Sequence, residues 1–79
     1  MKDILWNTVF LDEFIRLAAP TEFEIQIIRS RMADRSRVQQ SFDFSRSLPR
    51  VDAAIKSIRK KYDAVQPYSS ILPPRKKKV

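Results

Sequence analysis

The stretch that decides the fold is Ser47–Val65, which reads SLPRVDAAIKSIRKKYDAV. Its apolar residues recur at spacings of three and four, the repeat of one face of an α-helix. They are Leu48, Val51, Ile55, Ile58, Tyr62 and Val65. Pro49 falls in the first turn, where its missing N–H costs little and its fixed φ angle suits a helix. With Ser47 as N-cap, the spacing predicts a helix over residues 47–65, roughly 28 Å long at ~1.5 Å per residue.

The other faces of this expected helix carry small and cationic side chains. Arg50, Lys56, Lys60 and Lys61 lie away from the apolar seam, with Asp52, Ala53 and Ser57 among them. One side of the helix can therefore close a core while the other stays open to an acidic partner. A helix of this size fits the major groove of B-DNA, which is ~12 Å wide.

The charge of the chain is large and unevenly distributed. The net charge of the 79 residues is +7. Residues 1–33 hold four Lys or Arg and five Asp or Glu, a net charge of −1, whereas residues 34–79 hold twelve against four, a net charge of +8. This asymmetry favours a scaffold that carries a polyanion-binding surface over a general charge excess for solubility.

The composition argues against most enzyme classes and cofactor sites. There is no cysteine, histidine or glycine, which removes disulfides, the usual metal ligands and general base, and glycine-rich phosphate loops. No apolar run approaches the ~20 residues of a membrane span, and the opening MKDILWNTVF has an acid where a signal peptide would be basic. We expect a cytoplasmic, non-enzymatic module with no cofactor and no metal.

A first helix is expected over residues 3–18, with Asp3 as its N-cap and Pro20 ending it. Its apolar residues form two stripes, Ile4, Leu11, Ile15 and Ala18 beside Trp6, Phe10, Phe14 and Leu17. Such a wide apolar face must either be wrapped by the domain or be shared with a second subunit. The segment 1–19 is thus expected to pack on the domain or to form a homodimer.

Capping residues place two further helices. Thr21 and Glu24 form the pattern of a capping box, and the helix that follows should run to Met32. Its inward residues are expected to be Phe23, Ile27, Ile28 and Met32. Either Asp34 or Ser36 can cap a short third helix through Val38 and Phe42. The fold class is therefore all-α, with four helices, and the last three have the lengths and breaks of a helix-turn-helix.

Residues 20–65, within an expected helix-turn-helix DNA-binding domain that spans 20–66, resemble region four of bacterial sigma factors and the related LuxR-type DNA-binding domains. The residues that carry the resemblance are Thr21, Glu24, Ile27, Ile28, Ser36, Phe44, Ser47, Val51, Ile55 and the run Arg59, Lys60 and Lys61. The chain departs from that pattern at several places. Gln40 and Arg46 stand where apolar residues are expected, Pro20 and Arg50 replace a leucine and a threonine, and Ser45 is nearest to the missing turn glycine.

The resemblance implies a division of roles among the polar residues. Four residues early in the last helix would face base edges, namely Pro49, Arg50, Ala53 and Ser57. Phosphate or flanking roles would fall to Arg35, Arg37, Arg46, Ser47, Asp52, Lys56, Lys60 and Lys61. Arg50 is the expected guanine contact, and Asp52 would either accept from cytosine or pair with Lys56. For each cation the alternative is a solvated surface charge.

The segment 67–79 contains three prolines and ends in RKKKV, so it is expected to be an extended basic tail. Docking of Ile71 and Leu72 on the domain, which would order the segment before them, is the alternative. Two functions from different classes are open. The first is sequence-specific binding of double-stranded DNA by a small transcriptional regulator of bacterial or mobile-element origin, associated with the nucleoid. The second is an adaptor that binds RNA polymerase or an anti-sigma type protein without specific DNA binding of its own.

Overall fold

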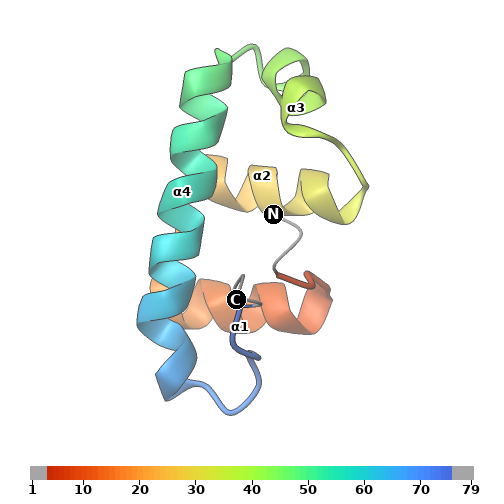
Figure 1. Cartoon of the computed structure of the whole chain (residues 1–79). Coiled ribbons are helices and arrows are strands. Elements are labelled where there is room, and N and C mark those ends of the chain that lie inside the picture. Colours follow the sequence, from red (N-terminus) through yellow and green to blue (C-terminus); the bar gives the residue numbers. More distant parts are fainter. Residues whose placement is uncertain (1–3, 76–79) are drawn as a thin grey trace.

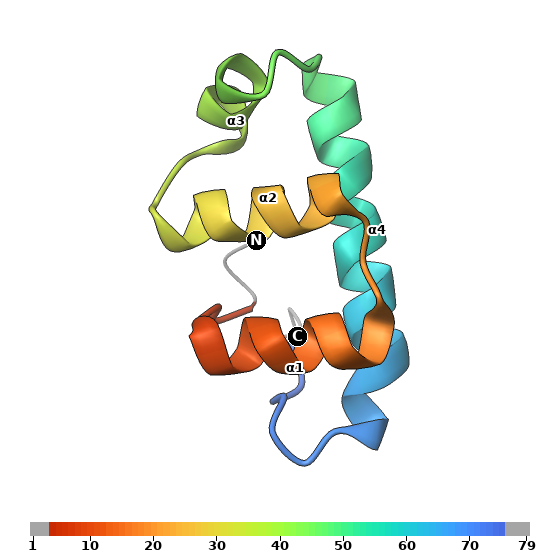
Figure 2. The same cartoon turned by 180° about the vertical axis from the view of Figure 1, so that it is seen from behind.

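The protein, seen in a computed structural model that describes residues 4–75, is built from helices that pack against one side of a single long helix (Figures 1 and 2). In chain order the elements are α1 (Thr8–Ala18), α2 (Glu22–Met32), α3 (Arg37–Asp43), α4 (Leu48–Val65) and the short 3₁₀ helix η1 (Gln66–Tyr68), with no strand in the described range. In Figures 1 and 2, α1 crosses the C-terminal half of α4, α2 crosses its middle, and α3 lies beside its N-terminal end. Each of these elements contacts α4.

The apolar seam of α4 forms the centre of the core, as its spacing predicts. Val51, Ile55, Ile58 and Tyr62 are buried, and the two end residues of the seam are half-buried. The opposing surface comes mainly from four buried residues of α1 and α2: Leu11, Phe14, Ile27 and Ile28. Burial of each such side chain is worth about 1.5–3 kcal/mol relative to exposure, so the seam is what holds the helices together.

The expected capping box at the start of α2 is present. The Glu24 N–H donates to Thr21 Oγ1 over 3.2 Å, and the Thr21 N–H donates to Glu24 Oε1 over 2.8 Å. A second capping box, between Ser36 and Gln39, starts α3 and selects Ser36 over Asp34 as the cap. The expectation that Met32 points inward is wrong, since it is 37% exposed at the end of α2.

The first helix begins later than the sequence predicts. Asn7, not Asp3, is the N-cap, and its Oδ1 accepts the Phe10 N–H over 2.9 Å; Asp3 lies outside the described residues. Residues 4–6, just before Asn7, are not helical, which allows Ile4 to be buried and the Trp6 ring to turn into the core. Asn is among the strongest N-caps, so the local signal and the tertiary contacts agree on this start.

The wide apolar face of α1 is covered by the chain itself. Phe14 is fully buried, and its ring centroid lies 5.3 Å from that of Trp6 and 6.2 Å from that of Tyr62. Trp6 and Phe10 are half-buried against the same cluster. The expected alternative of a dimer through these three aromatic residues is therefore disfavoured, because their surfaces already face the core.

The helix α3 is held by a buried polar residue. Gln40 is fully buried, and its Nε2 donates to the Ile27 carbonyl over 3.1 Å. The resemblance led to the expectation of an apolar residue at this position, and the amide instead ties α3 to the middle of α2. Val38 and Phe42 face outward from α3 and are 47% and 80% exposed.

The turn between α3 and α4 contains a residue in the left-handed conformation that is not a glycine. Ser45 has φ 52°, a conformation that costs an L-residue about 1–2 kcal/mol. Ser41 Oγ donates to the Arg46 carbonyl over 2.5 Å, and the Arg46 N–H donates to the Ser41 carbonyl over 3.1 Å. These two hydrogen bonds close the turn around Ser45. The sequence indicates the same residue as the one nearest to the missing turn glycine.

The segment that follows α4 is folded on the domain, at least as far as Arg75. The expectation of an extended tail is wrong for this part, since η1 turns the chain back and Leu72 is only 3% exposed. The Tyr62 hydroxyl donates to the Pro73 carbonyl, and Arg75 forms an ion pair with Asp63. The basic residues from Lys76 onward lie outside the described residues.

Candidate nucleic-acid interface

The outward face of α4 is the candidate interface, and its start is fixed by two local signals. Ser47 Oγ accepts the Arg50 N–H over 3.4 Å, and a proline stands in the first turn. Because the seam faces the core, the opposite side of the helix is open to solvent. The exposed residues of α4 are Pro49, Arg50, Asp52, Ala53, Lys56, Lys60, Asp63 and Ala64. The exposed Ser47 and the half-buried Ser57 lie at the borders of this face.

The expected phosphate contact Arg35 is engaged within the chain. Its Nε and Nη2 donate to the two carboxylate oxygens of Asp43 over 2.9 and 3.0 Å. This two-bond contact lowers the pKa of the Asp43 carboxyl and raises that of the Arg35 guanidinium, chiefly through the hydrogen bonds. Arg35 therefore braces the two ends of α3 and offers fewer donors to a phosphate.

Arg37 and Asp52 form a second bridge, between α3 and the first turns of α4. Arg37 Nη1 lies 2.8 Å from Asp52 Oδ2 and 3.1 Å from Oδ1. Asp52 therefore pairs with Arg37 and not with Lys56, the intramolecular partner that the sequence suggests. The bridge fixes the position of the short helix α3 beside the open face of α4.

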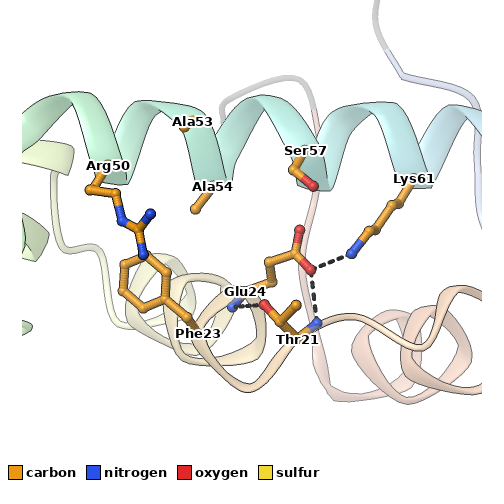
Figure 3. A pocket seen from close by; sticks show the side chains of 8 residues that line it. All are labelled: Thr21, Phe23, Glu24, Arg50, Ala53, Ala54, Ser57 and Lys61. Carbon is orange, nitrogen blue, oxygen red and sulfur yellow. Dashed lines mark hydrogen bonds and ion pairs between the residues drawn. The ribbon is translucent and has the colours of Figure 1, made fainter.

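Lys61 closes the other border of the face, toward the start of α2. Its Nζ lies 2.5 Å from Oε1 of Glu24, a carboxylate that is only 3% exposed. Burial alone would raise the pKa of Glu24, but the hydrogen bonds from Lys61, Thr21 and Ser57 outweigh it and the pKa is lowered. Figure 3 shows the carboxylate held between Thr21 and Lys61.

A shallow hollow of about 250 Å³ separates α4 from the start of α2 (Figure 3). Thr21, Phe23 and Glu24 line it from α2 and its cap, and Arg50, Ala53, Ala54, Ser57 and Lys61 line it from α4. Three of the four expected base contacts, Arg50, Ala53 and Ser57, thus share one border of the open face. Pro49 is exposed on the same helix but does not line the hollow.

An aromatic ring, rather than a carboxylate, accompanies the two arginines at the start of α4. The Arg46 guanidinium carbon lies 5.6 Å from the centroid of the Phe23 ring, whose edge contact with Phe44 spans 5.8 Å. The Arg50 side chain points toward the same ring in Figure 3. A cation–π contact leaves the N–H donors of a guanidinium available, so Arg46 keeps the donors that Arg35 and Arg37 have already used.

The structure therefore divides the expected contacts into two groups. Arg50, Lys56 and Lys60 form no ion pair within residues 4–75 and are exposed. Arg35, Arg37, Asp52 and Lys61 are held in bridges across the fold. The bridges join residues 8, 15 and 37 positions apart, a separation for which periodicity and capping give no signal.

Three further findings concern metal sites, membrane spans and known proteins. Among residues 4–75, no group of three or more His, Cys, Asp or Glu side chains could hold a metal ion. No helix in the same range is both long and apolar enough to cross a lipid bilayer. Comparison of the chain with models of protein families, with curated proteins and with solved structures finds no match.

Proposed function

We propose that the protein binds double-stranded DNA in a sequence-dependent manner through the open face of α4. In this proposal α3 and α4 act as a helix-turn-helix, with α4 as the recognition helix in the major groove. The role that follows is that of a small transcriptional regulator.

The observation that carries the proposal is the two-sided character of α4. One side of an 18-residue helix is buried as the centre of the core, and the other shows three exposed cations with no carboxylate partner in the described range. Unpaired cations on a rigid helix raise the local concentration of a polyanion without the cost of breaking ion pairs first. The alternation of these cations with Ala53 and Ala64 lets the helix backbone approach a groove closely.

The roles of individual residues follow from their surroundings. In this proposal Arg50 donates two hydrogen bonds to guanine, a contact worth about 1–3 kcal/mol of discrimination. Arg46, Lys56 and Lys60 are placed to meet phosphates, which position the protein without reading sequence. Arg37 supports the interface indirectly, because its bridge to α4 holds α3 beside the recognition face.

A protein-interaction adaptor is the second candidate, and one observation favours it. Phe42 is 80% exposed on α3, and its neighbour one turn earlier, Val38, is 47% exposed. Large exposed apolar side chains that lie together mark protein-binding surfaces more often than nucleic-acid surfaces. A partner such as RNA polymerase or an anti-sigma type protein would then contact α3, and the cations of α4 would meet its acidic residues.

The two candidates are separated by selecting preferred duplexes from a random pool and measuring binding across salt concentrations with competitor DNA. The DNA-binding proposal predicts an enriched sequence whose binding survives competitor, with an affinity that falls as salt rises. It also predicts that Arg50→Ala relaxes the preference at one base pair, whereas Lys60→Ala weakens all duplexes alike. A pool that yields no enriched sequence, with weak binding abolished by moderate salt, would favour the adaptor.

A further inference from the structure

One carboxylate stands among the cations in the first part of α4. Asp52 is the only acidic residue from Leu48 to Lys61, a stretch that holds five Lys or Arg. It is exposed, and it precedes Lys56 by four residues, so the two lie on the same row of the helix surface. A carboxylate at this place repels phosphates. On charge alone, Asp52 therefore weakens the interface that the open face of α4 provides.

Asp52 also holds an arginine that would otherwise meet the same polyanion. Arg37 Nη1 lies 2.8 Å from Asp52 Oδ2 and 3.1 Å from Oδ1. The side chains are 57% exposed for Arg37 and 47% exposed for Asp52. An exposed ion pair of this kind contributes little to stability, and the buried Gln40 ties α3 to α2 independently of it. The pair therefore matters less to the fold than to a charged ligand.

The other two bridges near the interface are arranged differently. The partner of Lys61 is Glu24, which is 3% exposed and belongs to the cap of α2. The partner of Arg35 is Asp43, which lies on α3 itself. Of these three carboxylates, Asp52 is the one on α4, the helix that enters the groove in the proposed function.

An additional phosphate contact favours the wrong complexes more than the right one. Base contacts such as that of Arg50 fix the register of a specific complex, so another arginine can use only the phosphates within its reach there. A non-specific complex slides along the duplex and can adopt the register that meets most phosphates. An arginine that is held by a carboxylate therefore costs the non-specific complex more affinity, and the ratio of specific to non-specific binding rises.

We propose that Asp52 is a specificity-determining residue, which pairs with Arg37 and so lowers the affinity for DNA of unrelated sequence more than that for the preferred sequence. This inference rests on the proposed function, because it concerns the same face of α4. It requires no contact between Asp52 and a base. Asp52→Asn keeps the shape of the side chain and removes its charge, so this change releases Arg37.

The test is Asp52→Asn, with Asp63→Asn as the matched control. Asp63 lies on the same helix, is exposed and also accepts two hydrogen bonds from an arginine, Arg75. Each variant raises the net charge of the chain by one. Asp63 lies about 16 Å further along α4 at ~1.5 Å per residue, beyond the screening length of ~10 Å at 0.1 M salt. Fluorescence anisotropy across salt concentrations gives the affinities for the selected duplex and for a duplex of unrelated sequence.

We expect Asp52→Asn to bind the unrelated duplex about five- to tenfold more tightly, with a salt slope steeper by about one, and to gain less than about threefold on the selected duplex. Asp63→Asn should change both affinities by less than about twofold. Equal gains by the two variants, or equal gains of Asp52→Asn on the two duplexes, would overturn this inference alone. Failure of the proposed function is visible already in wild type, as the absence of any preferred duplex, and it overturns both.

A second measurement needs no variant and covers the case in which Asp52→Asn displaces α3. The side-chain Nε–H signals of Arg37 and Arg46 are followed in the ¹⁵N-labelled wild-type chain during titration with the unrelated duplex. The Arg46 guanidinium lies against the Phe23 ring, so its signal should move as phosphates approach. The Arg37 signal should stay in place, because Asp52 holds its guanidinium. Equal movement of the two signals would contradict the role of Asp52.

Discussion

Replacing Glu24 by glutamine should lower the free energy of unfolding by about 1–2 kcal/mol. The carboxylate is 3% exposed, accepts the Thr21 N–H over 2.8 Å and lies 2.5 Å from Lys61 Nζ. A glutamine keeps the shape of the side chain and one acceptor for the Thr21 N–H, so most of the ~1 kcal/mol of the cap is retained. What is lost is the charge-assisted bond to Lys61, worth about 1.5–3 kcal/mol when the partner is ionised. Because Lys61 is 34% exposed and can turn to water, the lower part of that range applies.

The assay is urea unfolding at neutral pH, with Glu22→Gln as the matched control. Glu22 lies in the same first turn of α2 but is exposed, so its replacement should cost only a few tenths of a kcal/mol through the helix dipole. A double-mutant cycle with Lys61→Met should give a coupling of about 1 kcal/mol between the two side chains. Equal effects of the two glutamine variants would refute the buried bridge.

The stability difference between wild type and Glu24→Gln should also depend on pH, in a direction that follows from the pKa of Glu24. The pKa of Glu24 is lowered in the folded protein from its ordinary value of 4.5, so its contribution is complete above that pH and is lost as the pH falls through the folded value. The stability difference between wild type and Glu24→Gln should therefore shrink below about pH 4.5. Glu13 and Asp43 also have lowered pKa values. The stability that is lost when they are protonated is the same in wild type and in Glu24→Gln.

Three further variants test individual features of the fold by urea unfolding. Ser45→Gly should stabilise the protein by about 0.5–1 kcal/mol, because glycine adopts a positive φ without strain; a loss of stability would mean that Ser45 is not left-handed. Gln40→Ala should lower the free energy of unfolding by about 2–3 kcal/mol, because it leaves a cavity and removes the hydrogen bond to the Ile27 carbonyl. A loss of less than about 0.5 kcal/mol would contradict the burial of Gln40. Leu72→Ala should lower the free energy of unfolding by about 2–3 kcal/mol, whereas Ile71→Ala should change it by no more than about 0.5 kcal/mol. Equal effects of the two variants would show that the final segment is not anchored through Leu72.

The parts of the fold that sequence reasoning predicts are those with a local physical signal. The 3-4 spacing of the α4 seam, the proline in its first turn and the Thr21–Glu24 capping box each depend on residues within a few positions of one another. The second box, formed by Ser36 and Gln39, carries the same kind of signal and could have fixed the start of α3 from the sequence. Ser45 could likewise be placed in the turn, because the helices on both sides bound it.

The parts that sequence reasoning misses depend on distant contacts. The start of α1 is set where Trp6 must leave the helix to meet Phe14 and Tyr62. Pro67 and the basic end suggest an extended tail, but η1 turns the chain back, and of the two residues that could dock, Leu72 is buried while Ile71 is exposed. At the candidate interface, periodicity places the cations on the outer faces of α4 and cannot tell which of them meet a carboxylate from another helix.

The central claim is that the open face of α4, and not another surface, contacts DNA. The most direct test is to follow the backbone amide resonances of the ¹⁵N-labelled protein during titration with its selected duplex. The proposal predicts that the largest shifts fall on residues 46–60, with smaller ones near the start of α2, while those of Val9 and Phe42 change little. Shifts centred on Phe42 or on α1, or no shifts with any duplex at low salt, would contradict it.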